Sequence, residues 1–196
     1  VRSTMVSAAV SAAMLAGFYS TPVRAQQAPL TPNQARAHDI YKQMIEINTA
    51  DSVGSVTTAV DAMAARFRAA GFPAADVQIL TPEGHPTKAN LVVRYRGTGH
   101  DKKPLLLLAH LDVVAALRSD WSMDPFVLTE KDGYYYGRGS SDDKAMASIF
   151  VANLLRDKAA GWKPDRDVIL ALTSDEESGD ANGVDWLVSN HKDLID

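Results

Sequence analysis

Apolar residues along this chain follow two periodicities, one typical of amphipathic helices and one typical of strands. Helical spacing predicts helices over residues 32–47, 56–70, 142–160 and 182–191. Short apolar or alternating runs predict strands over residues 77–80, 91–95, 105–108, 126–129, 134–136 and 168–173. Their alternation predicts the α/β class, as a three-layer sandwich around a mostly parallel mixed sheet with one antiparallel hairpin.

Local signals support several of these elements. Thr31, Pro32 and Gln34 have the types and spacing of an N-cap, a first helical residue and a capping box. Gly71 is placed to end the second helix. In the helix that opens at Asp142, we expect the buried face to be formed by Ala145, Ile149, Ala152, Leu154 and Leu155.

The stretch 105–114, LLLLAHLDVV, predicts a buried central strand that ends in two polar residues, His110 and Asp112. A core strand has no packing reason to carry an imidazole and a carboxylate. In an open α/β sheet, ligands bind at the carboxyl ends of parallel strands, so this position indicates a site. In extended chain, residues two apart point to the same side, so Asp112 could orient His110 or share its metal.

Two further acidic clusters also follow predicted strands, Asp142-Asp143 and Asp175 to Glu177. Parallel strands would bring all three polar clusters together, and like charges so close repel unless a cation compensates them. Acids at a helix N-terminus are also favoured by the helix dipole, so capping remains an alternative for both clusters. The pattern predicts a metal site.

The chain has no cysteine, so disulfides and thiolate ligands are excluded and His, Asp and Glu are the available metal ligands. Such a set suits Zn²⁺, with Co²⁺ or Mn²⁺ as alternatives. A carboxylate between two cations can bridge them, which is the arrangement that activates water for hydrolysis. In Glu176-Glu177, one side chain can bind metal while its neighbour acts as general base.

Composition is that of an ordinary globular protein, with 46% hydrophobic and 22% charged residues in 196. The formal net charge is -4, and the chain has no run of Lys and Arg interleaved with aromatic residues. A nucleic-acid partner is therefore not expected.

Residues 1–25 have the pattern of a secretory signal peptide: Arg2, an apolar Ala-rich run and small residues before Gln26. The apolar run is too short to span a bilayer, so no membrane association is expected after cleavage. The alternative is an Ala-rich amphipathic helix. We expect a linker over residues 26–30, a catalytic part over 31–196, and a secreted or periplasmic protein.

Three motifs in this order and spacing, HLDVV at 110–114, YGRGSSDDK at 136–144 and TSDEESG at 173–179, resemble the M20 family of metallopeptidases. This group contains carboxypeptidases, aminoacylases, dipeptidases, acetylornithine deacetylase and succinyl-diaminopimelate desuccinylase. The resemblance covers roughly residues 31–196 and implies a zinc-exopeptidase-like fold. Ser140, Ser141 and Ala145 are mild departures, because glycine is often found at these positions.

The resemblance also implies a role for each matching residue. His110 would bind one zinc ion, and Asp112 would orient His110. Asp142 would bridge two zinc ions, and the peptide bond that follows it is expected to be cis. Glu177 would bind the second ion, and Glu176 would be the general base. A water held between the metals would attack the carbonyl carbon of an amide.

Family members are longer than this chain, with a lid and dimerisation domain, a further carboxylate ligand and a final His ligand beyond residue 196. The resemblance therefore implies an incomplete domain, substrates that are small peptides or N-acyl amino acids, and a full-length form that is a candidate homodimer. We expect the chain alone to bind metal weakly and to hydrolyse nothing. The alternatives are a catalytically inactive remnant or metal-binding module, and another co-catalytic zinc aminopeptidase.

Overall fold

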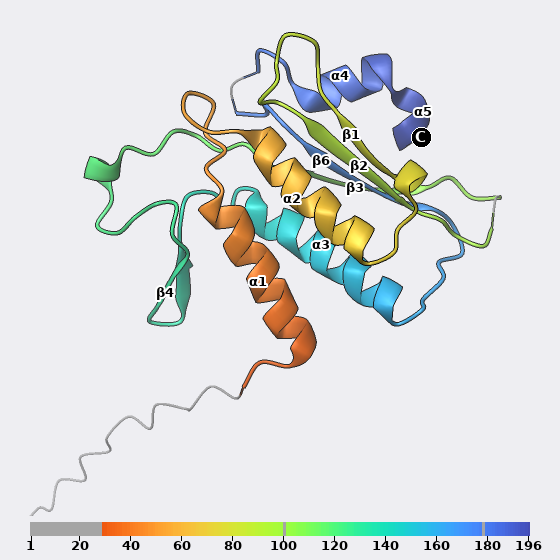
Figure 1. The fold of residues 1–196 in the computed structure, drawn as a ribbon, viewed down its shortest axis with the longest axis horizontal. Helices are drawn as coiled ribbons and strands as arrows, with labels where there is room; N and C mark the ends of the chain where they lie inside the picture. The colour runs from red at the N-terminus through yellow and green to blue at the C-terminus, as the bar shows by residue number, and fades with distance from the viewer. Residues whose placement is uncertain (1–28, 100, 178) are drawn as a thin grey trace, which may run out of the picture.

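A computed structural model describes residues 29–99, 101–177 and 179–196 (Figure 1). The helices are α1 (Pro32–Glu46), α2 (Val56–Ala69), α3 (Lys144–Ala159), α4 (Gly183–Asn190) and α5 (Lys192–Ile195), with short 3-10 turns at Ala74–Asp76 and Arg118–Asp120. The strands are β1 (Val77–Leu80), β2 (Asn90–Tyr95), β3 (Leu105–His110), β4 (Thr129–Lys131), β5 (Tyr134–Tyr136) and β6 (Val168–Thr173).

The main sheet has the strand order β1-β2-β6-β3. β3 pairs with β6 in parallel, whereas β1 with β2 and β2 with β6 are antiparallel. The predicted α/β class and mixed sheet are therefore confirmed. Within the described residues, however, the parallel pairing is the minority, because β1 and β2 form an antiparallel outer pair rather than extending the parallel part.

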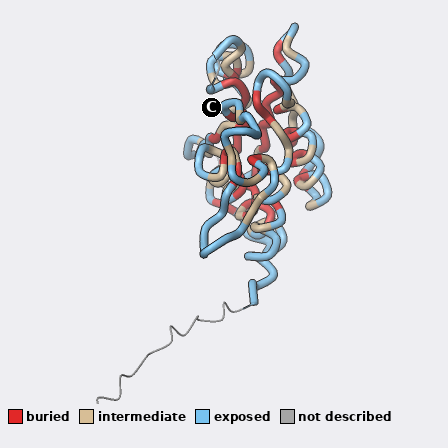
Figure 2. The backbone as a smooth tube through the Cα atoms, turned by 90° about the vertical axis from the view of Figure 1, so that its left-hand side faces the viewer, coloured by how far each residue is buried: buried red, intermediate tan, exposed pale blue. Residues whose placement is uncertain are grey.

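Helices cover both faces of this sheet, as Figure 1 shows. The larger core lies between the sheet and α1, α2 and α3, and includes Leu170 and Leu172 of β6. The smaller core lies against α4 and includes Ile169 and Ala171 of the same strand, together with Leu187. Because successive residues of β6 enter opposite cores, the whole strand is buried. Figure 2 shows buried backbone in the interior, with exposed backbone around it. The three-layer sandwich is confirmed.

The prediction that 105–108 is a buried central strand is wrong. β3 lies at the edge of the four-stranded sheet, and Leu105, Leu106 and Leu108 are 52%, 39% and 44% exposed. Leu107 and Ala109 point to the α3 side and pack in the larger core. α4 packs on β2 and β6 instead, so no described residue covers the other face of β3 fully. The central buried strand is β6.

Several local predictions are confirmed. Thr31 caps α1, with a capping box in which Gln34 N donates to Thr31 Oγ1 and Thr31 N donates to Gln34 Oε1. α2 ends one residue earlier than expected, and Gly71 follows it with a φ of +79°. These features depend on neighbours in sequence, so they could be predicted without the tertiary structure.

The buried face predicted for the 142–160 helix is partly wrong. α3 begins at Lys144. Its buried positions include the predicted Ala152, Leu154 and Leu155, but also Ala147 and Val151, which were not predicted. Ile149 is 55% exposed. The buried face begins at Lys144 and not at Ala145, so it is rotated by about one residue from the predicted face.

The hairpin is confirmed with a shifted first strand. Lys131 pairs with Tyr134, so the turn is the two-residue segment Asp132-Gly133 and the first strand is β4 rather than 126–129. Both turn residues have positive φ, +54° and +81°, as the favoured two-residue hairpin turns require.

The predicted signal peptide, 1–25, lies outside the described residues, as do the first residues of the linker 26–30. Both stay predictions. Among the described helices, none has the length and apolar character that crossing a membrane requires.

Candidate metal site

The parallel pairing of β3 with β6 brings the first and third polar clusters together. His110 is the partner of Thr173 in the register, and Leu111 N donates to Thr173 O over 2.9 Å. Both strands therefore end at the same edge of the sheet. The loop after β6, residues 174–182, carries Glu176 and Glu177 and is called here the acidic loop; its residue 178 lies outside the described part.

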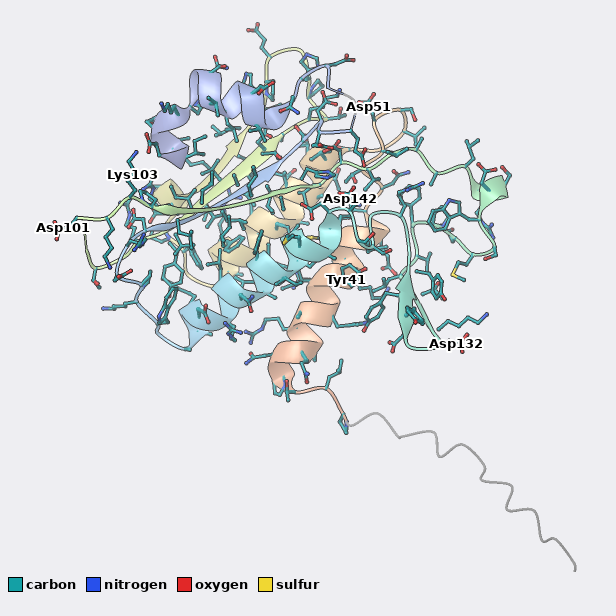
Figure 3. The ribbon with its side chains drawn as sticks, turned by 180° about the vertical axis from the view of Figure 1, so that it is seen from behind. Tyr41, Asp51, Asp101, Lys103, Asp132 and Asp142 are labelled. Atoms are coloured by element: carbon teal, nitrogen blue, oxygen red, sulfur yellow. The ribbon has the colours of Figure 1, made fainter. Side chains whose placement is uncertain are left out.

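The second cluster reaches this edge from the turn before α3. Figure 3 shows Asp142 at the start of this helix, at the opposite end of the sheet from Asp101 and Lys103. Gly139 in the same turn has a φ of +78°, and a Cβ there would lie 2.8 Å from a side-chain carbon of Val113. The close approach of the turn thus requires glycine. The Asp142-Asp143 peptide bond is cis, as expected.

Three of the predicted ligands converge in the structure. One ligand atom from each of His110, Asp142 and Glu177 lies within 4.8 Å of the other two. His110 Nε2 lies 2.9 Å from Asp142 Oδ1 and 4.0 Å from Glu176 Oε2. The Glu176 side chain is 56% exposed, so the predicted general base stands beside the cluster and faces solvent.

Asp112 lies behind His110 and also contacts the acidic loop. His110 Nδ1 lies 3.1 Å from the main-chain oxygen of Asp112 and 3.5 Å from its Oδ1. Both are acceptors, so they favour the tautomer with a proton on Nδ1 and leave Nε2 free to bind a ligand. Asp112 Oδ2 accepts a hydrogen bond of 2.9 Å from Glu177 N. One buried carboxylate therefore orients two of the candidate ligands.

The charges of the cluster shift the pKa values of its members. Burial lowers the pKa of His110, but hydrogen bonds with Asp112 and Asp142 outweigh burial and raise the pKa to about 9. Burial, followed by repulsion from Asp142, raises the pKa of Glu177. The raised pKa of His110 favours its positively charged form, and the raised pKa of Glu177 disfavours its negatively charged form. Both shifts show that the cluster favours positive charge.

This donor set fits a divalent cation. An imidazole nitrogen and carboxylate oxygens are the ligands that zinc accepts when cysteine is absent. Asp112 Oδ1 is buried 3.5 Å from His110 Nδ1, so the carboxylate places negative charge behind the imidazole. The atom that approaches His110 Nε2 is a carboxylate oxygen of Asp142, which places two candidate donors side by side.

The capping alternative accounts less well for these acids. Asp143 is the N-cap residue of α3, but its side chain makes no capping hydrogen bond. α4 is capped by Asn182, whose side chain accepts from Val184 N and Asp185 N, so Glu176 and Glu177 do not cap it.

Sequence reasoning missed two buried lysines near the site. Lys144 is fully buried, and its Nζ donates to Ile47 O over 2.8 Å; burial lowers its pKa to about 7. Lys88 is 9% exposed and contacts Asp175, the first acid of the third cluster. Lys144 directly follows the Asp-Asp pair, which could have drawn attention to it. Lys88 stands 87 positions from Asp175, so no local pattern links the two.

Comparison with known proteins relates the part of the chain that carries this site to one family. Residues 106–196, which contain all the predicted site residues, match the sequence model of peptidase family M20/M25/M40. The chain is 42% identical over 100 residues to succinyl-diaminopimelate desuccinylase from Delftia acidovorans, covering 50% of this chain and 26% of that protein. It is 29% identical over 150 residues to aminoacylase-1 from Sus scrofa, covering 76% of this chain and 36% of that protein.

Solved structures show the same fold. Human carnosine dipeptidase 1 superposes with a TM-score of 0.64 and 23% identity, over 84% of this chain and 38% of that one. The chain thus spans well under half the length of the relatives it matches.

Proposed function

We propose that this chain is the N-terminal part of the catalytic domain of a metal-dependent hydrolase that cleaves an amide or peptide bond, because residues 106–196 match the sequence model of peptidase family M20/M25/M40. The observation that carries the proposal is the convergence of His110, Asp142 and Glu177, from three separate parts of the chain, within 4.8 Å.

In this proposal the site holds two zinc ions. His110, through Nε2, would hold one ion, Glu177 would hold the other, and Asp142 would be shared between them. The bound metals would polarise the substrate carbonyl and lower the pKa of a water molecule. The proposal is supported by the donor types, by the tautomer that Asp112 favours, and by the preference of the cluster for positive charge.

Glu176 is the proposed general base. Its side chain is exposed beside the ligand cluster, 4.0 Å from His110 Nε2, so it can take a proton from water and deliver it to the departing nitrogen. Asp112 acts through His110 and Glu177: its main-chain oxygen lies 3.1 Å from His110 Nδ1, and its Oδ2 accepts a hydrogen bond from Glu177 N.

The proposed substrates are small peptides or N-acyl amino acids. Support comes from relatives named as a desuccinylase, an aminoacylase and a dipeptidase, all of which share the fold or the sequence of the matched part. Secretion is proposed from the pattern of residues 1–25 alone.

A second candidate function is metal binding without hydrolysis by this 196-residue chain. It is favoured by the small share of each relative that the chain covers, and by the ligand set among the described residues, in which a single imidazole joins the carboxylates. An incomplete ligand set would bind zinc more weakly than a closed one.

The test has two parts. Zinc titration of the chain by calorimetry should show binding that His110→Ala removes and Glu176→Gln retains. Hydrolysis of dipeptides and N-acyl amino acids is then assayed with the protein that carries whatever its gene encodes after Asp196. Glu176→Gln should abolish this hydrolysis.

Absence of zinc binding, or hydrolysis that survives Glu176→Gln, would refute the proposed function. Hydrolysis by the 196-residue chain itself, abolished by Glu176→Gln, would instead refute the second candidate.

A further inference from the structure

Asp175, the second residue of the acidic loop, has an unusual backbone conformation. Asp175 has a φ of +64°, in the left-handed region that favours glycine, and it is 1% exposed. Aspartate is among the residues that tolerate this region best, but it still needs surrounding contacts to hold it there. Asp175 immediately precedes Glu176 and Glu177. Its backbone conformation therefore sets the direction of the chain after β6 and, with it, the direction in which the two glutamate side chains point.

Lys88, in the loop before β2, makes one of the contacts that hold the Asp175 side chain. Its Nζ lies 2.7 Å from Asp175 Oδ1 and 3.0 Å from Asp51 Oδ1. The Lys88 side chain is 11% exposed and that of Asp51 is 51% exposed. Figure 3 shows Asp51 at the same end of the sheet as Asp142.

The Lys88 ammonium group is charged at neutral pH. Burial lowers its pKa, but hydrogen bonds with Asp175 and Asp51 outweigh burial and raise it above the usual value. The other oxygen of Asp175 accepts from Ala181 N, near the end of the acidic loop. Asp175 therefore links Lys88 to both ends of the acidic loop.

The same loop is held at two more points. Ser174 N donates to Asn90 Oδ1 over 3.0 Å, and Ser174 Oγ donates to Lys88 O over 2.8 Å. On the side of β3, Glu177 N donates to Asp112 Oδ2. Glu176 and Glu177 thus lie between an anchor on Lys88 and an anchor on Asp112.

We propose that Lys88, supported by Asp51, is a positioning residue that holds Asp175 and so aims Glu176 and Glu177 at the ligand cluster. The metal-binding consequence rests on the proposed function, whereas the conformational consequence does not. Removing Lys88 would take away a cation that lies 2.7 Å from the buried Asp175 carboxylate, and the loop would then move to bring that charge toward water.

The experiment compares the full chain with four variants. Lys88→Met removes the cation, Lys88→Arg keeps it, and Asp51→Asn removes the exposed partner alone. Lys102→Met is the matched control, because it removes an exposed lysine whose partner, Asp165, lies far from the site. Two quantities are measured: amide hydrogen exchange by NMR in the metal-free chain, and the Kd for Zn²⁺ by calorimetry.

Lys88→Met should accelerate exchange of the Glu177 amide by about tenfold or more while the amides of β6 keep their protection. It should weaken zinc binding by roughly 10- to 100-fold, as loss of a residue that orients ligands does. Lys88→Arg should restore both quantities, and Lys102→Met should change neither. If Lys88→Met fails to fold, Asp51→Asn tests the proposal instead. It should also accelerate exchange of the Glu177 amide and weaken zinc binding, but by less than Lys88→Met.

If Lys88→Met leaves exchange of the Glu177 amide unchanged, the proposal is overturned. An equal acceleration at every amide would also overturn it, because a general loss of stability produces that result. If the parent chain binds no zinc, the proposed function fails, and the exchange data still decide the role of Lys88.

Discussion

Protonation of His110 should stabilise the metal-free chain, and the effect should disappear at high pH. The folded pKa of about 9 lies above the usual value of 6.5. The folded state therefore binds the proton more tightly, so the stabilisation is complete below about pH 6.5 and is lost as the pH rises through about 9. A difference of about 2.5 in pKa corresponds to about 3 kcal/mol.

Solvent reduces this figure. The His110 side chain is 11% exposed, but that of its partner Asp142 is 76% exposed. Screening of this contact leaves an expected contribution of about 2 kcal/mol, carried mainly by the buried Asp112.

The assay is urea unfolding in the presence of a chelator, at pH 6 and at pH 9.5, for the parent chain and for His110→Asn. The comparison with the variant is necessary because Lys144 has the opposite dependence. Burial lowers the pKa of Lys144 to about 7, so its destabilising effect declines as the pH rises. Subtracting the variant removes the contribution of Lys144.

At each pH, the free energy of unfolding of His110→Asn is subtracted from that of the parent chain. This difference should be larger at pH 6 than at pH 9.5 by about 2 kcal/mol. A difference that is constant with pH, or that grows toward pH 9.5, would refute the reasoning. At saturating zinc the dependence should vanish, since the metal binds the neutral imidazole.

Two further predictions concern the fold. Leu170→Ala in the buried strand β6 should lower the free energy of unfolding by about 2–5 kcal/mol, as measured by urea unfolding. Leu105→Ala at the exposed edge should lower it by less than about 1 kcal/mol. Similar losses for the two variants would contradict the placement of β3. Gly183→Ala would bring a Cβ to 2.0 Å from Asn90 Oδ1, so it should cost about 1–3 kcal/mol in thermal unfolding and weaken the anchor of the acidic loop. An unchanged Tm would show that the α4 N-terminus shifts freely.

The sequence by itself predicted most of the helices and strands, and it singled out the polar clusters that the structure brings together. Thr31 with Gln34, and Asp132 with Gly133, are local signals whose partners lie within a few residues, so they predicted a helix start and a hairpin turn. His110 drew attention because a polar residue ends an apolar strand, and Glu177 because it belongs to an acidic cluster that directly follows one.

Only the tertiary structure decided which surfaces are buried and which distant residues meet. The four leucines of β3 have the pattern of a buried strand, but burial depends on the strand's place in the sheet, and β6 occupies the centre instead. The buried face of α3 likewise follows from how the helix packs. Lys88 meets Asp175 across 87 positions of sequence. Such contacts are set by the packing of the whole chain, and local periodicity contains no information about them.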